Sequence, residues 1–236
     1  MLDTSAGQRR GQRGVTLIEL LISMIILSVV TTMLIAGWIS LQNSYAHSVK
    51  TNNARAEVRD AVSRMSREIR DAQPVALTTP AQSPFTLADP YEIDFYSAFN
   101  SVDVRSKGNG TDALRLTRFK LDTSGSTAQK TLYWQRDTNA SGTFDVGDRK
   151  VVLAKGVVNP SIADTRVTPN TTYTAIFTYG YKDTSGNYTS ADTIASADLA
   201  KIISVQIHLI VDANLKHAPV YADLQTTVRP RNSPQN

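Results

Sequence analysis

One polar segment of this chain has the residue types and spacing of a calcium-binding loop. Residues 137–148, DTNASGTFDVGD, place oxygen-bearing side chains on alternate residues, and Gly142 stands at the sixth position, where such loops turn sharply. Oxygen ligands spaced in this way can surround a hard cation such as Ca²⁺. The expected ligands are Asp137, Asn139, Ser141, Asp145 and Asp148 at positions 1, 3, 5, 9 and 12, with the backbone carbonyl of Thr143 at position 7.

Two features of this segment fit a calcium loop less well. Position 12 is Asp148 rather than the longer glutamate, and the flanking stretches LYWQR and KVVLA are typical of strands rather than helices. A hairpin connection rich in Asn, Asp, Ser and Gly would have the same composition without any metal. Both interpretations stay open, so calcium is a candidate cofactor and no cofactor is required.

Glu19 is the second residue of chemical interest, because it is the single ionisable side chain in the apolar run of residues 15–41. A charged side chain near the centre of a bilayer costs about 2.5 kcal/mol or more, and it usually has a partner. Within about one helical turn of the membrane surface this cost becomes small. Glu19 therefore either pairs with a cation or lies at the membrane surface.

The apolar run itself is long enough to cross a membrane. As a helix it would rise about 40 Å, and the hydrocarbon core of a bilayer is about 30 Å thick. It is too long for the apolar part of a cleaved secretory signal, about 7 to 15 residues, and it lacks the polar face of a core helix. Arg9, Arg10 and Arg13 precede it. We therefore expect one pass through the inner or cytoplasmic membrane, with the amino end cytoplasmic and the rest extracytoplasmic.

Residues 14–19, GVTLIE, resemble the signature of type IV prepilins: a basic leader ending in glycine, four mostly apolar residues, then glutamate. The resemblance implies that a prepilin peptidase cuts between Gly14 and Val15 and that the new amine of Val15 is methylated. It also implies that Glu19 pairs with the terminal amine of a neighbouring subunit in a filament. Such a pair is physically reasonable, because opposite charges attract more strongly at low dielectric than in water.

Two departures from the major-pilin pattern concern the same segment. Val15 stands where major pilins commonly have phenylalanine, a position that varies more in minor pilins and pseudopilins, and the membrane segment lacks the proline of many major pilins. With its long helix, large β-rich head and closing LQTTVRPRN, the chain resembles minor pilin W and the type II secretion pseudopilin J more than a major pilin.

A helix is predicted to continue beyond the membrane segment. Residues 42–73 favour helix, and Pro74 disfavours helical conformation in the residue before it. Glu68 and the arginines around it are expected on its exposed faces. Its buried face is predicted from apolar residues at steps of four, three, four and three: Val58, Val62, Met65, Ile69 and Ala72.

After Pro74 the pattern changes to short runs of β-branched and aromatic residues, which predict strands. The fold class is therefore α+β and pilin-like, with a long transmembrane and amphipathic helix packed on an antiparallel sheet. The predicted strands are 91–97, 113–121, 131–135, 150–154, 173–181, 202–211 and 220–228. The predicted segments are a leader at 1–14, the two helix halves at 15–41 and 42–73, a head at 74–229 with a linker at 78–90, and a loose tail at 230–236.

Composition argues against several functions. The chain has no cysteine, which excludes disulfides and thiolate chemistry, and the net charge of +4 is too modest to indicate nucleic-acid binding. The three histidines are far apart in sequence, and no nucleophile elbow, metal-protease motif or phosphate loop is present. We therefore expect no enzymatic activity and no nucleic-acid partner.

The expected function is that of a structural minor pilin or pseudopilin, which helps to initiate or assemble a type IV pilus or a type II secretion filament. The expected partners are the membrane, prepilin peptidase, other pilin or pseudopilin subunits and the assembly machinery. The alternatives are a major pilin and a signal-anchored extracytoplasmic binding module. An anchored hydrolase has no candidate residues in this sequence.

Overall fold

The structure, a computed structural model, describes residues 16–74, 83–98, 114–124, 130–163, 172–183, 185–213 and 221–231. Gly14 and Val15, at the predicted cleavage site, lie outside these residues. The chain divides into a first unit, Met1–Ser48, and a second unit, Val49–Asn236. The two units are described separately below.

The first element is the helix α1, Leu17–Arg70. No proline interrupts it, and most of its residues favour helix. It ends three residues before the predicted position, residue 73, because the chain there joins the sheet. Ala72 forms a bridge to Ser97, and the backbone N–H of Gln73 donates to the carbonyl of Tyr96 at 2.9 Å.

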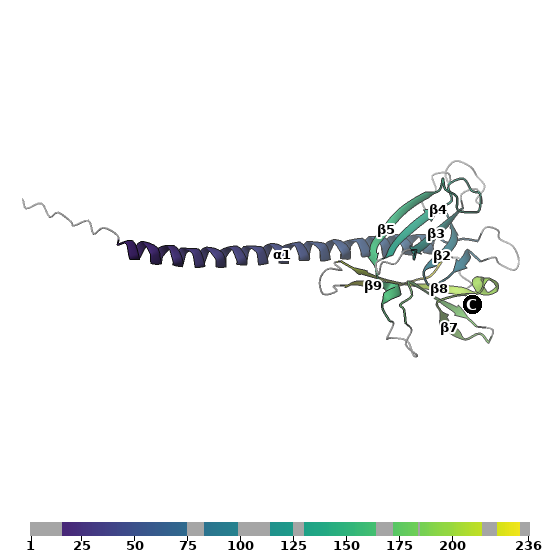
Figure 1. The fold of residues 1–236 in the computed structure, drawn as a ribbon. Coiled ribbons are helices and arrows are strands. Elements are labelled where there is room, and N and C mark those ends of the chain that lie inside the picture. The colour runs from purple at the N-terminus through teal and green to yellow at the C-terminus, as the bar shows by residue number, and fades with distance from the viewer. Residues whose placement is uncertain are drawn as a thin grey trace, which may run out of the picture. The chain divides into compact units, whose positions relative to one another are not determined.

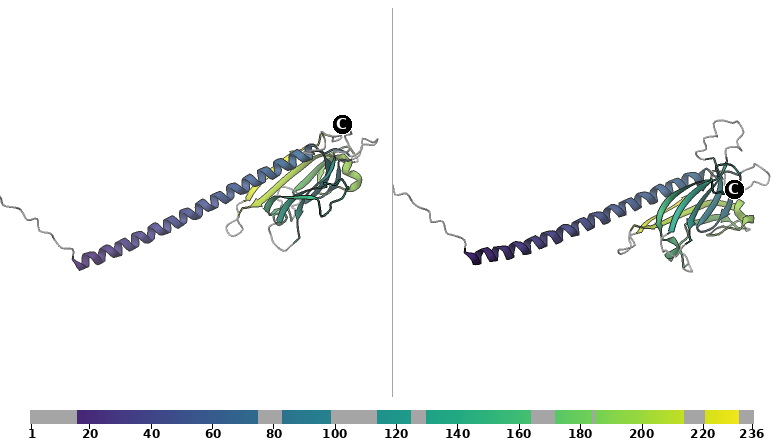
Figure 2. Two further views of the ribbon diagram at one scale, coloured as in Figure 1. Left: turned by 90° about the horizontal axis from the view of Figure 1, so that it is seen from above. Right: turned by 45° about the horizontal axis from the view of Figure 1, so that its top comes forward.

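The second unit contains one antiparallel sheet, whose strands follow the path β1-β2-β3-β4-β5-β8-β6-β7, with β9 paired to β8. Figure 1 shows β2 to β5 as neighbours, and Figure 2 shows the sheet curled beside the carboxyl-terminal part of α1. The strands are β1 (Phe85–Ala88), β2 (Glu92–Ser97), β3 (Arg115–Asp122), β4 (Lys130–Arg136), β5 (Arg149–Val157), β6 (Phe177–Lys182), β7 (Tyr188–Ala191), β8 (Ile202–Asp212) and β9 (Tyr221–Val228); two 3₁₀ helices are η2 (Asn159–Ser161) and η3 (Ser196–Lys201).

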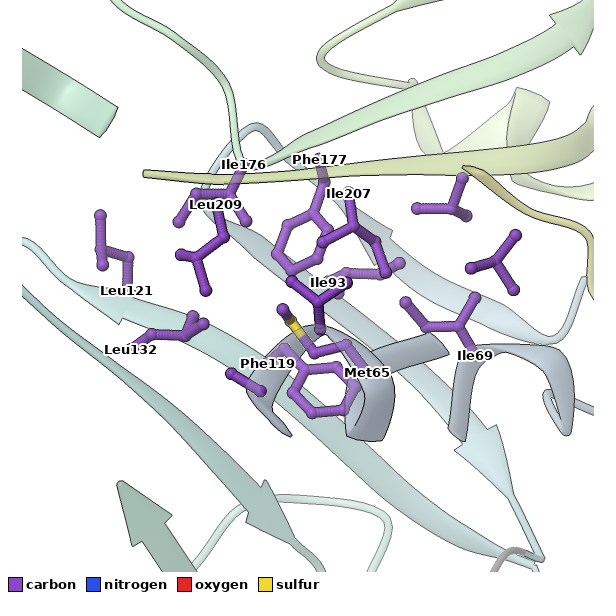
Figure 3. Packing of buried hydrophobic residues seen from close by; sticks show 14 of the residues in the cluster. Met65, Ile69, Ile93, Phe119, Leu121, Leu132, Ile176, Phe177, Ile207 and Leu209 are labelled. Carbon is purple, nitrogen blue, oxygen red and sulfur yellow. The ribbon is translucent and has the colours of Figure 1, made fainter. Parts of the chain in front are cut away.

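The predicted face of α1 forms one side of the core. The predicted residues are each at most 4% exposed: Val58, Val62, Met65 and Ile69 on α1, and Ala72 just beyond its end. Figure 3 shows Met65 among the apolar side chains of the sheet, close to Ile93 and Phe119. The α+β prediction of a long apolar helix on an antiparallel sheet is therefore confirmed.

Three details of the strand prediction were wrong. The predicted linker 78–90 contains β1, whose four residues lie between Pro84 and Pro90, so that their strand pattern is too short to recognise. The strand β7 was not predicted at all. Residues 173–176 are not in a strand, because the backbone N–H groups of Ile176 and Phe177 both donate to the carbonyl of Pro90.

Glu68 was predicted to lie on an exposed face of the helix, and this was also wrong. Its side chain is 2% exposed. Its Oε2 accepts a hydrogen bond from Nε1 of Trp134 at 2.8 Å, and its Oε1 accepts one from Nε of Arg64 at 3.2 Å. The carboxylate points inward because β4 places an indole donor opposite this turn of α1.

Candidate functional site

The first turn of α1 carries Glu19 together with a residue that the sequence analysis overlooked. The backbone N–H of Glu19 donates to Oγ1 of Thr16 at 3.3 Å and to the carbonyl of Thr16 at 3.0 Å. Thr16 therefore caps the amino end of α1, and Glu19 stands three residues later, where a capping box has its acidic residue. The sequence signal was the spacing T-x-x-E in TLIE. The positive end of the helix dipole favours a carboxylate at this place.

The apolar part of α1 has an almost entirely exposed surface in this single chain. The large apolar side chains between Leu17 and Leu41 are 47% to 80% exposed. Four of its hydroxyl groups donate to helix carbonyls, among them Ser23 to that of Glu19 at 2.8 Å and Thr31 to that of Leu27 at 2.7 Å. This helix is long and apolar enough to cross a membrane, and its internally bonded hydroxyl groups add little cost inside one.

Asp137, the first residue of the predicted calcium loop, is buried and organises the loop backbone. Its Oδ1 accepts hydrogen bonds from the N–H groups of Asn139 and Ser141 at 3.1 and 3.3 Å, and its Oδ2 accepts one from Gly142 at 2.8 Å. Ala140 and Gly142 have positive φ angles of 59° and 76°. The chain therefore turns tightly around this carboxylate, as the glycine at position 6 predicted.

Four further predicted positions lie within hydrogen-bond distance of one another. Oδ2 of Asp145 is 3.3 Å from Nδ2 of Asn139 and 3.2 Å from Oγ of Ser141, and Ser141 also donates to the carbonyl of Thr143 at 2.9 Å. The amide nitrogen of Asn139 faces Asp145 because its oxygen accepts the N–H of Ser141 at 2.9 Å. To bind a cation here, the side-chain amide of Asn139 would have to turn over, so that its oxygen instead of its nitrogen faces Asp145.

Asp148, the sixth predicted position, closes the loop instead of joining this group. Its Oδ1 accepts the backbone N–H of Thr138 at 2.9 Å, and its Oδ2 accepts that of Asp145 at 2.7 Å. Burial opposes ionisation of Asp148, but these hydrogen bonds outweigh it and lower the pKa of the carboxyl group. The short side chain that departs from the calcium-loop pattern thus has a structural role.

The loop is also attached to the sheet by a contact that the sequence did not indicate. The guanidinium group of Arg118 lies 4.0 Å from the ring centroid of Phe144, which is a cation–π distance. Arg118 is itself held by two hydrogen bonds to Asp94, at 2.8 and 2.7 Å. This arrangement fixes the loop against β3, so a ligand of the loop would bind to a segment that is already ordered.

The charge of the loop sets its expected affinity for a cation. In the part of the chain that the structure describes, no group of three or more His, Cys, Asp or Glu is arranged to hold a metal. A calcium ion would therefore rest on the carboxylates of Asp137 and Asp145 and on neutral oxygens. Sites with few charged ligands belong to the weak class, with dissociation constants of about 10⁻⁴ to 10⁻³ M.

Calcium is expected to raise the Tm of the full chain in detergent. At about 10 mM calcium and a dissociation constant of about 1 mM, the stabilisation is about 1.4 kcal/mol. Asp145→Asn should remove the rise, because it deletes a loop charge on an exposed side chain, and Asp137→Ala should remove it as well. Asp183→Asn, in another turn, serves as the control. If the Tm in calcium equals the Tm in magnesium and neither exceeds the Tm without metal, the loop is a metal-free hairpin connection.

Comparison with known proteins concerns the amino-terminal segment. Residues 9–35 match the family described as the prokaryotic N-terminal methylation motif. The match includes Gly14, Val15 and Glu19. No curated protein matches the chain with significant similarity. The motif match supports the prepilin resemblance of this segment, and together with the apolar surface of α1 it supports anchoring in a membrane.

Proposed function

We propose that the chain is a structural minor pilin or pseudopilin, which prepilin peptidase processes between Gly14 and Val15 and which then helps to initiate or assemble a type IV pilus or a type II secretion filament. The match of residues 9–35 to the methylation motif is the observation that carries this proposal. Val15 stands where major pilins commonly have phenylalanine, and this difference favours a minor pilin or pseudopilin over a major pilin. The proposed role is packing between subunits, without catalysis.

In the proposed sequence of events, the apolar segment first anchors the chain in the membrane and later packs into the filament. Before processing, the chain crosses the inner or cytoplasmic membrane once, with residues 1–14 cytoplasmic and the β-rich unit extracytoplasmic. After cleavage, the amine of Val15 becomes methylated, and the assembly machinery transfers the apolar helix from lipid into the filament. Exposed apolar side chains along α1 support this step, because they lose little on leaving lipid for the apolar surfaces of other subunits.

Replacing Gly14 tests the processing step. Gly14→Leu is expected to leave the chain at its precursor mass, because a large side chain beside the cleaved bond prevents the close approach that glycine allows. Intact-mass measurement of the membrane fraction reads the result. The wild-type chain should lack residues 1–14 and carry one added methyl group. Gly11→Leu, in the same leader, should process normally. A Gly14→Leu chain of mature mass would contradict the proposal and favour a plain signal anchor.

Abundance separates a minor from a major subunit. In sheared filaments a minor pilin or pseudopilin should be present at a small fraction of the main subunit. A filament composed mostly of this chain would instead identify it as a major pilin.

A further inference from the structure

A pocket of about 460 Å³ lies in the second unit, between α1 and one end of the strands β3, β4 and β5. It was not anticipated from the sequence, because its residues come from four separated segments. Five arginines line it: Arg64, Arg67, Arg115, Arg136 and Arg149. Three acidic residues, Asp60, Glu68 and Asp137, also line it. Five positive and three negative groups leave a formal charge of +2 on the lining.

Two of the three carboxylates are already engaged in the fold. Glu68 accepts hydrogen bonds from Trp134 and Arg64, and Asp137 accepts three from the backbone of its own loop. These bonds hold both carboxylates in place, and the charge of Glu68 offsets part of the charge of Arg64 and Arg136. The third, Asp60, is exposed to solvent, as are Arg67 and Arg149, so solvent screens the charges of all three. The less exposed charges, those of Arg64, Arg115 and Arg136 against those of Glu68 and Asp137, leave a formal charge of +1, so the local field in the pocket is positive.

Three of the five arginines have contacts within the fold that position their guanidinium groups. Arg136 is 8% exposed, and its Nη2 donates to the carbonyl of Ser97 at 3.0 Å. The guanidinium groups of Arg64 and Arg149 lie 4.2 and 5.8 Å from the ring centroid of Trp134. A buried guanidinium and two others set by one indole ring form an ordered group of donors, which loses little entropy when it binds a ligand.

We propose that this pocket binds a small oxyanion, a phosphate or a carboxylate group. Each guanidinium has several N–H groups in one plane, which match the oxygen pairs of phosphate and carboxylate. An apolar ligand would leave the arginines desolvated, and a cation would meet a positive field. Burial lowers the pKa of Arg136, although the nearby carboxylate of Glu68 opposes this shift. This proposal does not depend on the proposed function.

Binding is tested with pyrophosphate and citrate as probes, on the full chain in detergent, with EDTA present and at constant ionic strength. We expect saturable binding by calorimetry. Two variants on the same helix form a matched pair: Arg67 lines the pocket, whereas Arg59 does not, and both are exposed. Arg67→Gln should weaken binding by about 10-fold, and Arg59→Gln should leave it unchanged. Arg149→Gln, also at an exposed position, should act like Arg67→Gln.

The outcomes separate a site from general attraction to positive charge. Saturable binding that Arg67→Gln weakens and Arg59→Gln does not would support the pocket, and the tighter of the two probes would identify the source as phosphate or carboxylate. Equal losses in Arg67→Gln and Arg59→Gln would overturn the proposal, because the binding would then follow net charge alone. Absence of saturable binding by either probe would overturn it as well.

Discussion

Replacing Glu19 by glutamine is expected to reduce incorporation of the chain into filaments by roughly 100-fold or more, while cleavage after Gly14 continues. If Glu19 pairs with the terminal amine of a neighbouring subunit, the variant leaves that amine without its anion in an apolar interior. Removing one partner of a buried ion pair costs about 3 to 5 kcal/mol, and each 1.4 kcal/mol corresponds to about a factor of ten. The ratio of chain in sheared filaments to chain in membranes measures this effect.

The first turn of α1 suggests a second role for Glu19, which a control must separate from pairing. Thr16 and Glu19 stand at capping-box positions, so Glu19 could act simply by stabilising the start of the helix. Thr16→Val removes the cap, at a cost of about 0.5 to 2 kcal/mol, and keeps the charge of Glu19. Pairing predicts near-normal incorporation of Thr16→Val and partial recovery by Glu19→Asp. Equal defects in Thr16→Val and Glu19→Gln would mean that capping alone explains the residue.

The sequence predicted best what depends on local periodicity. The steps of four, three and four from Val58 to Ile69 follow the turn of an α-helix, and all five predicted residues are buried, including Ala72 just beyond the helix. The calcium-loop spacing correctly placed a sharp turn at Gly142, because that turn needs a positive φ angle which glycine adopts easily. In both cases the physical cause lies within a few residues of the pattern itself.

Features that depend on distant partners could not be predicted in this way. The burial of Glu68 depends on Trp134, 66 positions away, and the attachment of Phe144 depends on Arg118 on another strand. A polar residue on a helix looks exposed until its partner is known. The arginine pocket has the same origin, since helix, strand ends and loop bring its residues together only after the sheet has formed.

Glu68→Ala is expected to destabilise the full chain by about 3 to 5 kcal/mol, the range for breaking a buried ion pair. The change removes the acceptor of the buried indole N–H of Trp134 and the anion beside Arg64 and Arg136. A buried donor without an acceptor alone costs about 1 to 3 kcal/mol. Chemical unfolding in detergent measures the loss. Asp60→Asn, an exposed position on the same helix, should change stability by less than about 0.5 kcal/mol.

The pH dependence tests the same site in a second way. Burial raises the pKa of Glu68 above its ordinary value of 4.5, although the hydrogen bond from Trp134 and the charge of Arg64 oppose this shift. The folded protein therefore holds the proton of Glu68 more tightly than the unfolded chain does. Its contribution to stability is complete below about pH 4.5 and decreases as the pH rises through the folded pKa.

Glu68→Gln isolates this contribution, because glutamine imitates the neutral carboxyl group and does not titrate. The free energy of unfolding of the wild type, minus that of Glu68→Gln, should fall as the pH rises from about 4.5 toward neutrality. A difference that instead grows with pH would mean that Arg64 and Trp134 outweigh burial, and that Glu68 stabilises the fold as a fully ionised anion.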